Sequence, residues 1–208
     1  MNFSNSVKLH PWVGSDYFET HPRILILGLS MHSTENNIDK REVISMVRAI
    51  RNEEWTYAFF TKIGHAFSNE SHWYENGDGT NEYFLEKNEF WNSVAFYEYL
   101  HDIFNGPKEQ ISPKQFHNAQ KPFLEVVEKL EPDIILTLGF ITYENLPQMG
   151  EFVKTYIDDD LKMEVWKYKF PNKLSYVCRV QHPSSFGFET WKWGNLFHQF
   201  YLDFTKTT

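Results

Sequence analysis

The chain has 208 residues, which is enough for one domain with a substantial core. Its formal net charge of −8 argues against a protein that holds nucleic acid by a broad basic surface, because such binding depends on Lys and Arg side chains that neutralise phosphates. The single cysteine, Cys178, excludes an internal disulfide, a four-cysteine zinc site and an iron–sulfur cluster held by this chain alone.

The first predicted strand runs from Arg23 to Gly28, where a continuous apolar stretch stops at a glycine. A run without alternation is typical of a strand covered on both faces, as in a parallel sheet. Residues 1–22 show no period and predict an irregular N-terminal arm that packs on the surface. After the strand, residues 36–39 can start a helix, and residues 56–67 predict a second helix or a pair of short helices.

The middle of the chain predicts a loop, a second strand and a long helix. Residues 68–80 are rich in Gly, Asn and Asp, which marks an exposed loop, and residues 82–91 return to a helical pattern. A strand over residues 93–100 follows. Ser112-Pro113 suits the N-cap and first position of a helix that extends to about residue 130, and Pro122 should kink or divide it.

The last third predicts further strands and a terminal helix. Residues 134–139 form an apolar run closed by glycine, followed by a short helix over 141–146 and a region of variable character over 147–160. Residues 163–170 alternate apolar and charged side chains, which predicts an edge strand with one wet face. Residues 174–181 are more apolar and predict a central strand, and residues 189–205 predict the last helix.

This alternation of strands and helices predicts an α/β fold. We expect one domain over residues 1–208, a three-layer α/β/α sandwich around a mainly parallel sheet of four to five strands. Ligands of such sheets bind outside the carboxyl ends of the strands. The polar residues that the prediction gathers at this edge are Ser30, His32, Glu98, His182, Ser184 and Ser185.

Four motifs of the chain resemble the uracil-DNA glycosylase superfamily. They are the strand and glycine turn at residues 23–32, the segment Phe-Trp-Asn-Ser-Val-Ala-Phe-Tyr-Glu-Tyr at 90–99, the segment Pro-Asp-Ile-Ile-Leu-Thr-Leu-Gly at 132–139, and His182-Pro183-Ser184. The resemblance is strongest to uncharacterised bacterial members without an iron–sulfur cluster. His-Pro pairs also occur at His10 and His21, but only His182 follows a core strand.

The resemblance implies hydrolysis of the N-glycosidic bond of a flipped-out damaged base, with an oxocarbenium-like sugar and an anionic leaving base. His182 would stabilise the charge that develops on the base oxygen. Ser30 falls at the position of the residue that orients or activates water. Ser184 and Ser185 would contact phosphates, and Phe186 would be the wedge that enters the gap left by the base.

The same resemblance implies a base-binding set around these catalytic residues. Glu98 stands where the superfamily often uses Asn to read a pyrimidine edge, and an ionised carboxylate there would favour an amino group over the uracil carbonyl. Phe59 or Phe60 is the candidate for stacking on a base. The whole predicted base- or nucleotide-binding set is Gly28, Leu29, Met31, His32, Phe59, Phe60 and Glu98.

Two other functions stay open on the sequence alone. Serine is a poor general base, so the chain could be a catalytically silent module that binds a nucleotide or nucleic acid. It could also be a small hydrolase with Ser30 as nucleophile and His182 as base, although it has no G-x-S-x-G elbow. Structural roles compete as well, because Ser30 could cap a helix, Phe59 and Phe60 could be core residues, and Glu98 could lie at an exposed strand end.

We predict no metal and no cofactor, since the histidines lack the spacing of a recognisable zinc site. The predicted partner is DNA or a nucleotide, held at a local site. No apolar run approaches the roughly 20 residues of a membrane span, and the polar first residues lack the apolar core of a signal peptide. We therefore expect a cytoplasmic protein with no membrane partner; the oligomeric state does not follow from the sequence.

Overall fold

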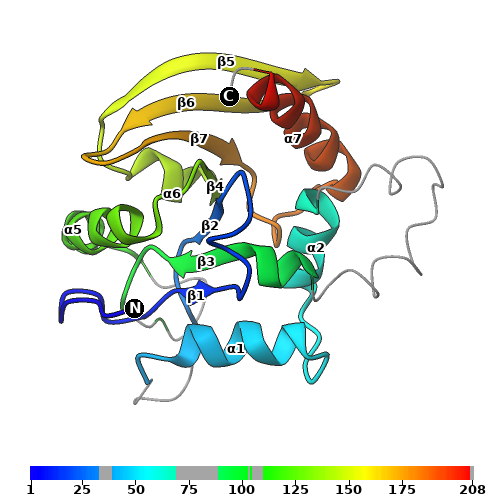
Figure 1. The fold of residues 1–208 in the computed structure, drawn as a ribbon. Coiled ribbons are helices and arrows are strands. Elements are labelled where there is room, and N and C mark those ends of the chain that lie inside the picture. The colour runs from blue at the N-terminus through cyan, green and yellow to red at the C-terminus, as the bar shows by residue number, and fades with distance from the viewer. Residues whose placement is uncertain (33–38, 69–88, 103, 105–109, 207–208) are drawn as a thin grey trace.

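A computed structural model describes residues 1–32, 39–68, 89–102, 104 and 110–206. Within this part of the chain, one seven-stranded sheet has the order β1-β3-β2-β4-β7-β6-β5 (Figure 1). Its strands are β1 Trp12–Val13, β2 Ile24–Gly28, β3 Val94–Glu98, β4 Ile134–Leu138, β5 Gly150–Asp158, β6 Leu161–Lys169 and β7 Leu174–Val180. The chain is therefore an α/β protein, as predicted.

The centre of the sheet is parallel, as the apolar runs predict. Strand β2 lies between β3 and β4, with Ile24 opposite both Val94 and Ile134, and β4 pairs in parallel with β7. Every residue of β2, β3 and β4 is buried. Because these strands are covered on both faces, their sequences can be apolar without alternation.

The sheet is larger and more mixed than the predicted four to five strands. Three pairings are antiparallel, namely β1 with β3, β6 with β7, and β5 with β6. Strand β6 was expected at an edge, but it lies between β5 and β7. The sequence prediction missed β5 because only its Tyr156 is buried, so the strand carries no apolar run.

The helices are α1 Glu42–Arg51, α2 Ala58–Phe67, α5 Pro113–Leu130, α6 Phe140–Glu144 and α7 Thr190–Thr205. Helix α5 covers one face of the sheet, whereas α2 and α7 pack together on the other (Figure 1). The predicted cap is present, since Ser112 and Gln115 form a reciprocal capping box at the start of α5. Pro122 does not divide this helix, which is continuous over 18 residues.

Several boundaries differ from the prediction or cannot be compared with it. Helix α1 begins at Glu42, later than the predicted start at 36–39, of which residues 36–38 lie outside the described residues. The predicted loop at 68–80 falls outside them too, apart from residue 68. Of the predicted helical pattern at 82–91, residues 89–91 are described and helical, and that helix continues to residue 93.

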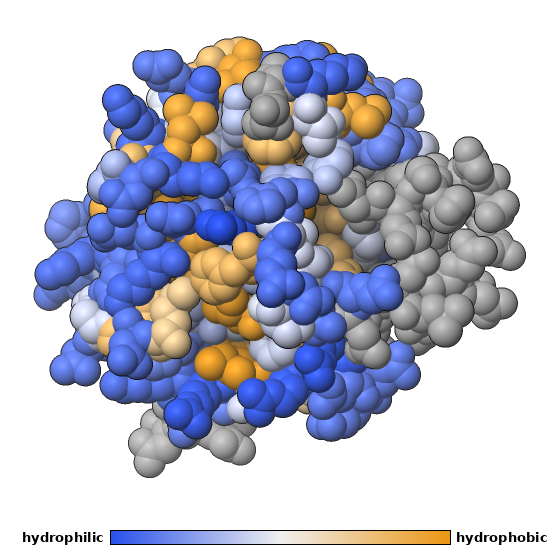
Figure 2. Space-filling view, viewed as in Figure 1, coloured by the Kyte–Doolittle hydropathy of each residue, from blue (hydrophilic) through white to orange (hydrophobic). Residues whose placement is uncertain are grey.

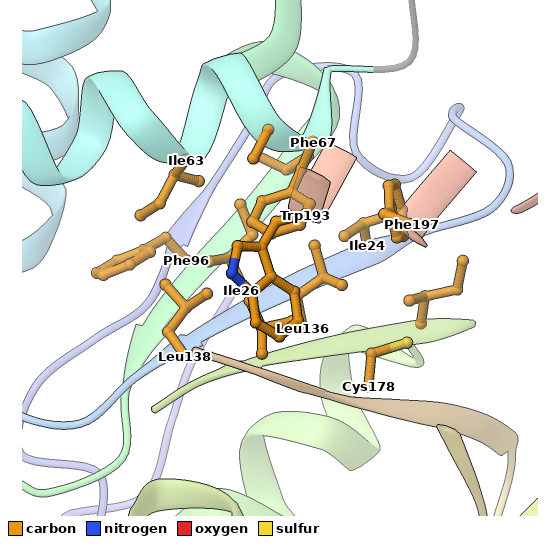
Figure 3. Packing of buried hydrophobic residues seen from close by; sticks show 14 of the residues in the cluster. Ile24, Ile26, Ile63, Phe67, Phe96, Leu136, Leu138, Cys178, Trp193 and Phe197 are labelled. Atoms are coloured by element: carbon orange, nitrogen blue, oxygen red, sulfur yellow. The ribbon is translucent and has the colours of Figure 1, made fainter. Parts of the chain in front are cut away.

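Two apolar layers hold the sheet. In the layer beneath α2 and α7, Ile26, Leu136 and Cys178 from three strands pack with Trp193 and Phe197 (Figure 3). The opposite layer joins alternate strand residues to α5. Burying one such side chain stabilises the fold by about 1.5–3 kcal/mol. The two layers therefore hold the parallel strands, and with them the strand ends, in place.

The N-terminal arm is irregular apart from β1, but it does not simply lie on the surface. Val7, Leu9, Trp12 and Tyr17 are buried, and the Trp12 indole N–H donates a hydrogen bond to the Trp91 carbonyl at 2.8 Å. The arm is therefore part of the core, which corrects the prediction that it packs on the surface. Its polar residues conceal this role because the buried side chains have no regular spacing.

The outer surface is mixed in character. Figure 2 shows one face that is mostly hydrophilic with separate hydrophobic patches. The exposed apolar side chains include Phe152, Val153 and Ile157 of β5. In the described part of the chain, no helix combines the length and the apolar character that crossing a membrane requires.

Candidate functional site

The carboxyl ends of the four parallel strands border two adjoining cavities, of about 470 and 420 Å³, within the roughly 300–1,000 Å³ range of small-molecule sites. Both are lined by Leu29, Ser30, His32 and His182. The first cavity is also lined by Met31, Met46, Trp55, Tyr57, Phe59, Phe60, Glu98 and Ser184. The second is also lined by Phe104, Ile111, Leu138, Gly139, Phe140, Ile141, Thr142, Gln181 and Ser185. Residues from the first and last parallel strands thus meet at one hollow.

Glu98 is a buried acid at this edge, and the site is built around it. Glu98 is 5% exposed, and among the described residues its Oε2 has no hydrogen-bond partner. Gly28 lies opposite Glu98 in the pairing of β2 with β3. A Cβ atom at residue 28 would lie 2.3 Å from Glu98 Oε2, so only glycine leaves room for the carboxyl group.

Burial raises the pKa of Glu98 to about 8, since removal from water disfavours the charged form. At neutral pH the side chain is therefore a carboxylic acid, with one hydroxyl donor and one carbonyl acceptor. Burial therefore disfavours the ionised carboxylate on which the expected preference for an amino group depends. The neutral acid can pair with a planar edge that carries an acceptor next to a donor.

His182 is held as a neutral imidazole. Its Nδ1 accepts a hydrogen bond from the Ser184 backbone N–H at 3.2 Å, which leaves the ring proton on Nε2. Burial, and secondarily the charge of His32, lowers the pKa of His182. The ring of Phe59 packs against the imidazole, with centroids 5.1 Å apart and planes 32° apart. His182 can therefore donate a hydrogen bond from Nε2.

The loop that carries His182 is tied to two helices. The Lys62 ammonium of α2 donates to the Pro183 carbonyl at 3.0 Å. The Gln181 amide donates to the Phe186 carbonyl at 3.2 Å and accepts from the Trp193 indole N–H of α7 at 3.3 Å. These contacts position the loop before any ligand arrives.

Ser30 lies between the two cavities and is half-buried. Among the described residues, the Ser30 hydroxyl forms no hydrogen bond with His182. The His182 Nδ1 accepts a backbone N–H, whereas the base of a serine hydrolase donates from that atom to a carboxylate. The geometry therefore gives no support to the alternative of a serine hydrolase.

The predicted stacking residues contribute to the wall of the first cavity. Phe60 is 1% exposed and packs on Trp91 and Phe96, so its main role is in the core. Phe59 is also buried and backs His182. Both rings therefore shape the cavity and support the imidazole.

The remaining predicted residues lie at different places around the two cavities. Ser184 lines the first cavity and Ser185 the second, whereas Phe186 is fully exposed and lines neither. Met31 is buried in the core, and exposed His32 forms an isolated bridge with Phe104. The Ser185 backbone N–H donates to the His182 carbonyl at 2.8 Å, so that N–H is already used within the turn.

Sequence reasoning missed the outer wall of the first cavity. Trp55 and Tyr57 line it, with exposures of 48% and 49%. A usable signal was present, because these rings directly precede the helix that carries Phe59 and Phe60. Phe140 and Ile141, exposed residues of α6, were missed at the second cavity.

No protein-family model and no curated protein matches this chain. Within the described residues, no three His, Cys, Asp or Glu side chains gather as a metal site. Functional inference therefore depends on the geometry of the two cavities.

Proposed function

We propose that this chain is a uracil-DNA-glycosylase-like protein that binds a nucleobase in its first cavity and cleaves the N-glycosidic bond of a flipped-out, damaged base in DNA. The observation that carries the proposal is the meeting of Ser30, Glu98 and His182 at one cavity of about 470 Å³. The resemblance of the motifs supports the same function. A flipped base needs a pocket with polar groups at its edge, and Ser30, Glu98 and His182 supply such groups in this cavity.

In the proposed reaction, the bond between the base nitrogen and the sugar carbon breaks and its electron pair leaves with the base. The His182 Nε2–H donates a hydrogen bond to the base oxygen on which negative charge develops. Water then attacks the oxocarbenium-like sugar carbon and loses its proton to solvent. Ser30 orients this water without serving as the base, because a serine hydroxyl does not accept a proton near neutral pH.

Glu98 selects the base in this proposal. A neutral carboxylic acid complements an edge with an acceptor beside a donor, as found in the cyclic amides of uracil and hypoxanthine. Glu98 lines the first cavity, and among the described residues its buried Oε2 has no hydrogen-bond partner, so a ligand edge that pairs with the carboxyl group adds hydrogen bonds that these residues do not supply. Binding of a matching edge is therefore favoured over binding of an apolar ring of similar size.

The test is cleavage of labelled oligonucleotides that contain uracil or hypoxanthine, single-stranded and in duplex. We expect cleavage by the wild type, and a loss of about 100-fold to 1,000-fold in His182→Ala, which removes the hydrogen-bond donor. His117→Ala is the matched control, since His117 is exposed on α5 at the opposite face of the sheet. Wild-type protein that folds but cleaves none of these substrates would contradict the enzymatic proposal.

A second candidate is a nucleotide-binding module without turnover, and the lack of a general base at Ser30 favours it. It predicts that deoxyuridine monophosphate raises the melting temperature while no substrate is cleaved. Glu98→Ala should remove the shift, because it removes the hydrogen-bond pair. Absence of any shift with nucleotides and with short oligonucleotides would rule out this module.

A further inference from the structure

Two aromatic rings at the outer wall of the first cavity are stacked but uncovered. The rings of Trp55 and Tyr57 lie with centroids 5.8 Å apart and planes only 22° apart. Each residue remains about half exposed, at 48% and 49%. Large apolar faces left in water next to a cavity are typical of binding surfaces.

The backbone holds this pair in place without a ligand. The N–H groups of Glu54 and Trp55 both donate to the Ala49 carbonyl of α1, at 2.9 and 3.3 Å. Glu53 adopts a left-handed conformation, with φ of 61°, that closes this turn. On the other side, the Tyr57 carbonyl accepts the Thr61 N–H of α2 at 3.1 Å. The pair is therefore preorganised, which lowers the entropic cost of binding.

The pair continues directly into the cavity. Tyr57 contacts the ring of Phe59 at 6.4 Å between centroids, and Phe59 contacts His182 at 5.1 Å. Trp55, Tyr57, Glu98 and His182 all line the same cavity. A base bound at Glu98 would thus have the rings of Trp55 and Tyr57 beside it, at the solvent-exposed side of the cavity.

The charge around the pair indicates how a strand would be held. Among the residues that the structure describes, no Lys or Arg lines the first cavity, and the turn before Trp55 carries the acids Glu53 and Glu54. Electrostatic contacts with phosphates therefore contribute little to affinity at the Trp55–Tyr57 pair. Stacking on aromatic rings can hold single strands without base-pair readout, whereas bases inside a duplex have no free face.

We propose that the Trp55–Tyr57 pair is a stacking subsite, which takes the base next to the one bound at Glu98. The ligand is accordingly an unpaired DNA strand of at least two nucleotides. This inference rests on the proposed function for the identity of the first base. It adds a preference for strand form that the first cavity alone does not give.

The experiment is calorimetric titration with three ligands that contain 2′-fluoro-deoxyuridine, whose fluorine resists glycosidic cleavage. They are the mononucleotide, a single-stranded pentanucleotide with the analogue at its centre, and the same strand in a duplex. We expect the single strand to bind more tightly than both others. Trp55→Ala should weaken its binding about 10-fold or more, as loss of one stacked base predicts, and weaken binding of the mononucleotide much less.

Trp191→Ala is the matched control, because Trp191 of α7 is 53% exposed and lines neither cavity. It should bind all three ligands as the wild type does. Trp55→Phe should retain most of the affinity for the strand, which separates ring stacking from the fold of the turn. The affinity of the strand should also fall only slightly between low and moderate salt.

The inference is overturned if Trp55→Ala leaves the single-strand affinity unchanged, or if it weakens mononucleotide and strand equally. Tighter binding of an RNA strand of the same sequence would overturn the assignment to DNA. The proposed function fails separately, when neither the mononucleotide nor the strand responds to Glu98→Ala. A strand that still depends on Trp55 in that case would leave the stacking subsite standing.

Discussion

The parallel centre of the sheet and its antiparallel wing, β5 with β6, differ in what their strands bury. All residues of β2, β3 and β4 are buried, whereas β5 buries only Tyr156. The wing still supports the fold, since Tyr156 packs on Phe200 of α7. Burial on both faces of the centre, and on one face of the wing, accounts for the difference in sequence.

The difference also decides where a site can form. Parallel strands deliver their carboxyl ends to one edge, so residues distant in sequence, such as Ser30 and His182, line the same cavity. Neighbouring antiparallel strands run in opposite directions and split their ends between two edges. The centre therefore carries the candidate site, and the wing extends the sheet and covers α7.

The largest difference between the two regions should appear on truncation of single side chains. Leu136→Ala in β4 removes a fully buried side chain and should lower the free energy of unfolding by about 2–5 kcal/mol. Val153→Ala in β5, where the residue is 45% exposed, should change it by less than about 0.5 kcal/mol. Urea denaturation measures both. Equal losses would show that the wing is as tightly packed as the centre.

The second prediction concerns pH and the buried acid of the centre. Because the pKa of Glu98 is raised to about 8, the unfolded chain loses this proton at lower pH than the folded chain does. The free energy of unfolding should therefore fall as pH rises from about 4.5 to about 8, by at most about 1.4 kcal/mol per pH unit. Below and above that window Glu98 contributes no slope.

Glu98→Gln should remove this contribution, since an amide does not titrate. Glu151→Gln at an exposed position of β5 is the matched control from the wing. Denaturation at pH 5, 6.5 and 8 distinguishes the variants. A wild type and a Glu98→Gln variant with parallel pH profiles would mean that Glu98 is ionised in the folded protein at neutral pH.

The third prediction compares Gly28, which lies beside Glu98, with Gly187, which lines neither cavity. Gly28→Ala places Cβ 2.3 Å from Glu98 Oε2 and should cost about 1–3 kcal/mol of stability while it displaces the carboxyl group. Gly187→Ala has no atom within 4 Å, but its φ of 76° is unfavourable for alanine and should cost about 1–2 kcal/mol. Only Gly28→Ala should also weaken binding of deoxyuridine monophosphate.

A double variant tests the cause. If the carboxyl group is what Gly28→Ala displaces, the stability loss should be smaller in the background of Glu98→Ala than in the wild type. Additive losses in stability would show that residue 28 is constrained by its backbone and not by Glu98.

The sequence predicts the parallel centre well because burial on both faces leaves a local mark. The runs ending at Gly28 and Gly139 reveal β2 and β4 without knowledge of their neighbours. The edge strand β5 leaves no such mark, since its exposed positions tolerate any residue that suits a strand. The place of β6 inside the sheet was unpredictable for the same reason, because it depends on β5.

The site follows the same division. Its main members could be found from chain order alone, because strand ends of a parallel sheet converge. The neutral state of Glu98 could not, since it depends on burial by residues from other elements. Trp55 and Tyr57 were missed because their exposure, and not their residue type, separates them from core aromatics.

The smallest predicted effect tests whether a loss of stability away from the cavities changes ligand binding. Ser112→Ala removes the cap of α5 and should cost about 1 kcal/mol, because the backbone N–H of Gln115 loses its acceptor. Helix α5 packs on the face of the sheet opposite α2, so affinity for deoxyuridine monophosphate should not change. Denaturation and calorimetric titration measure the two quantities. A loss of affinity as large as in Gly28→Ala would mean that ligand affinity follows overall stability. The effect of Gly28→Ala on binding could then not be assigned to displacement of the Glu98 carboxyl group.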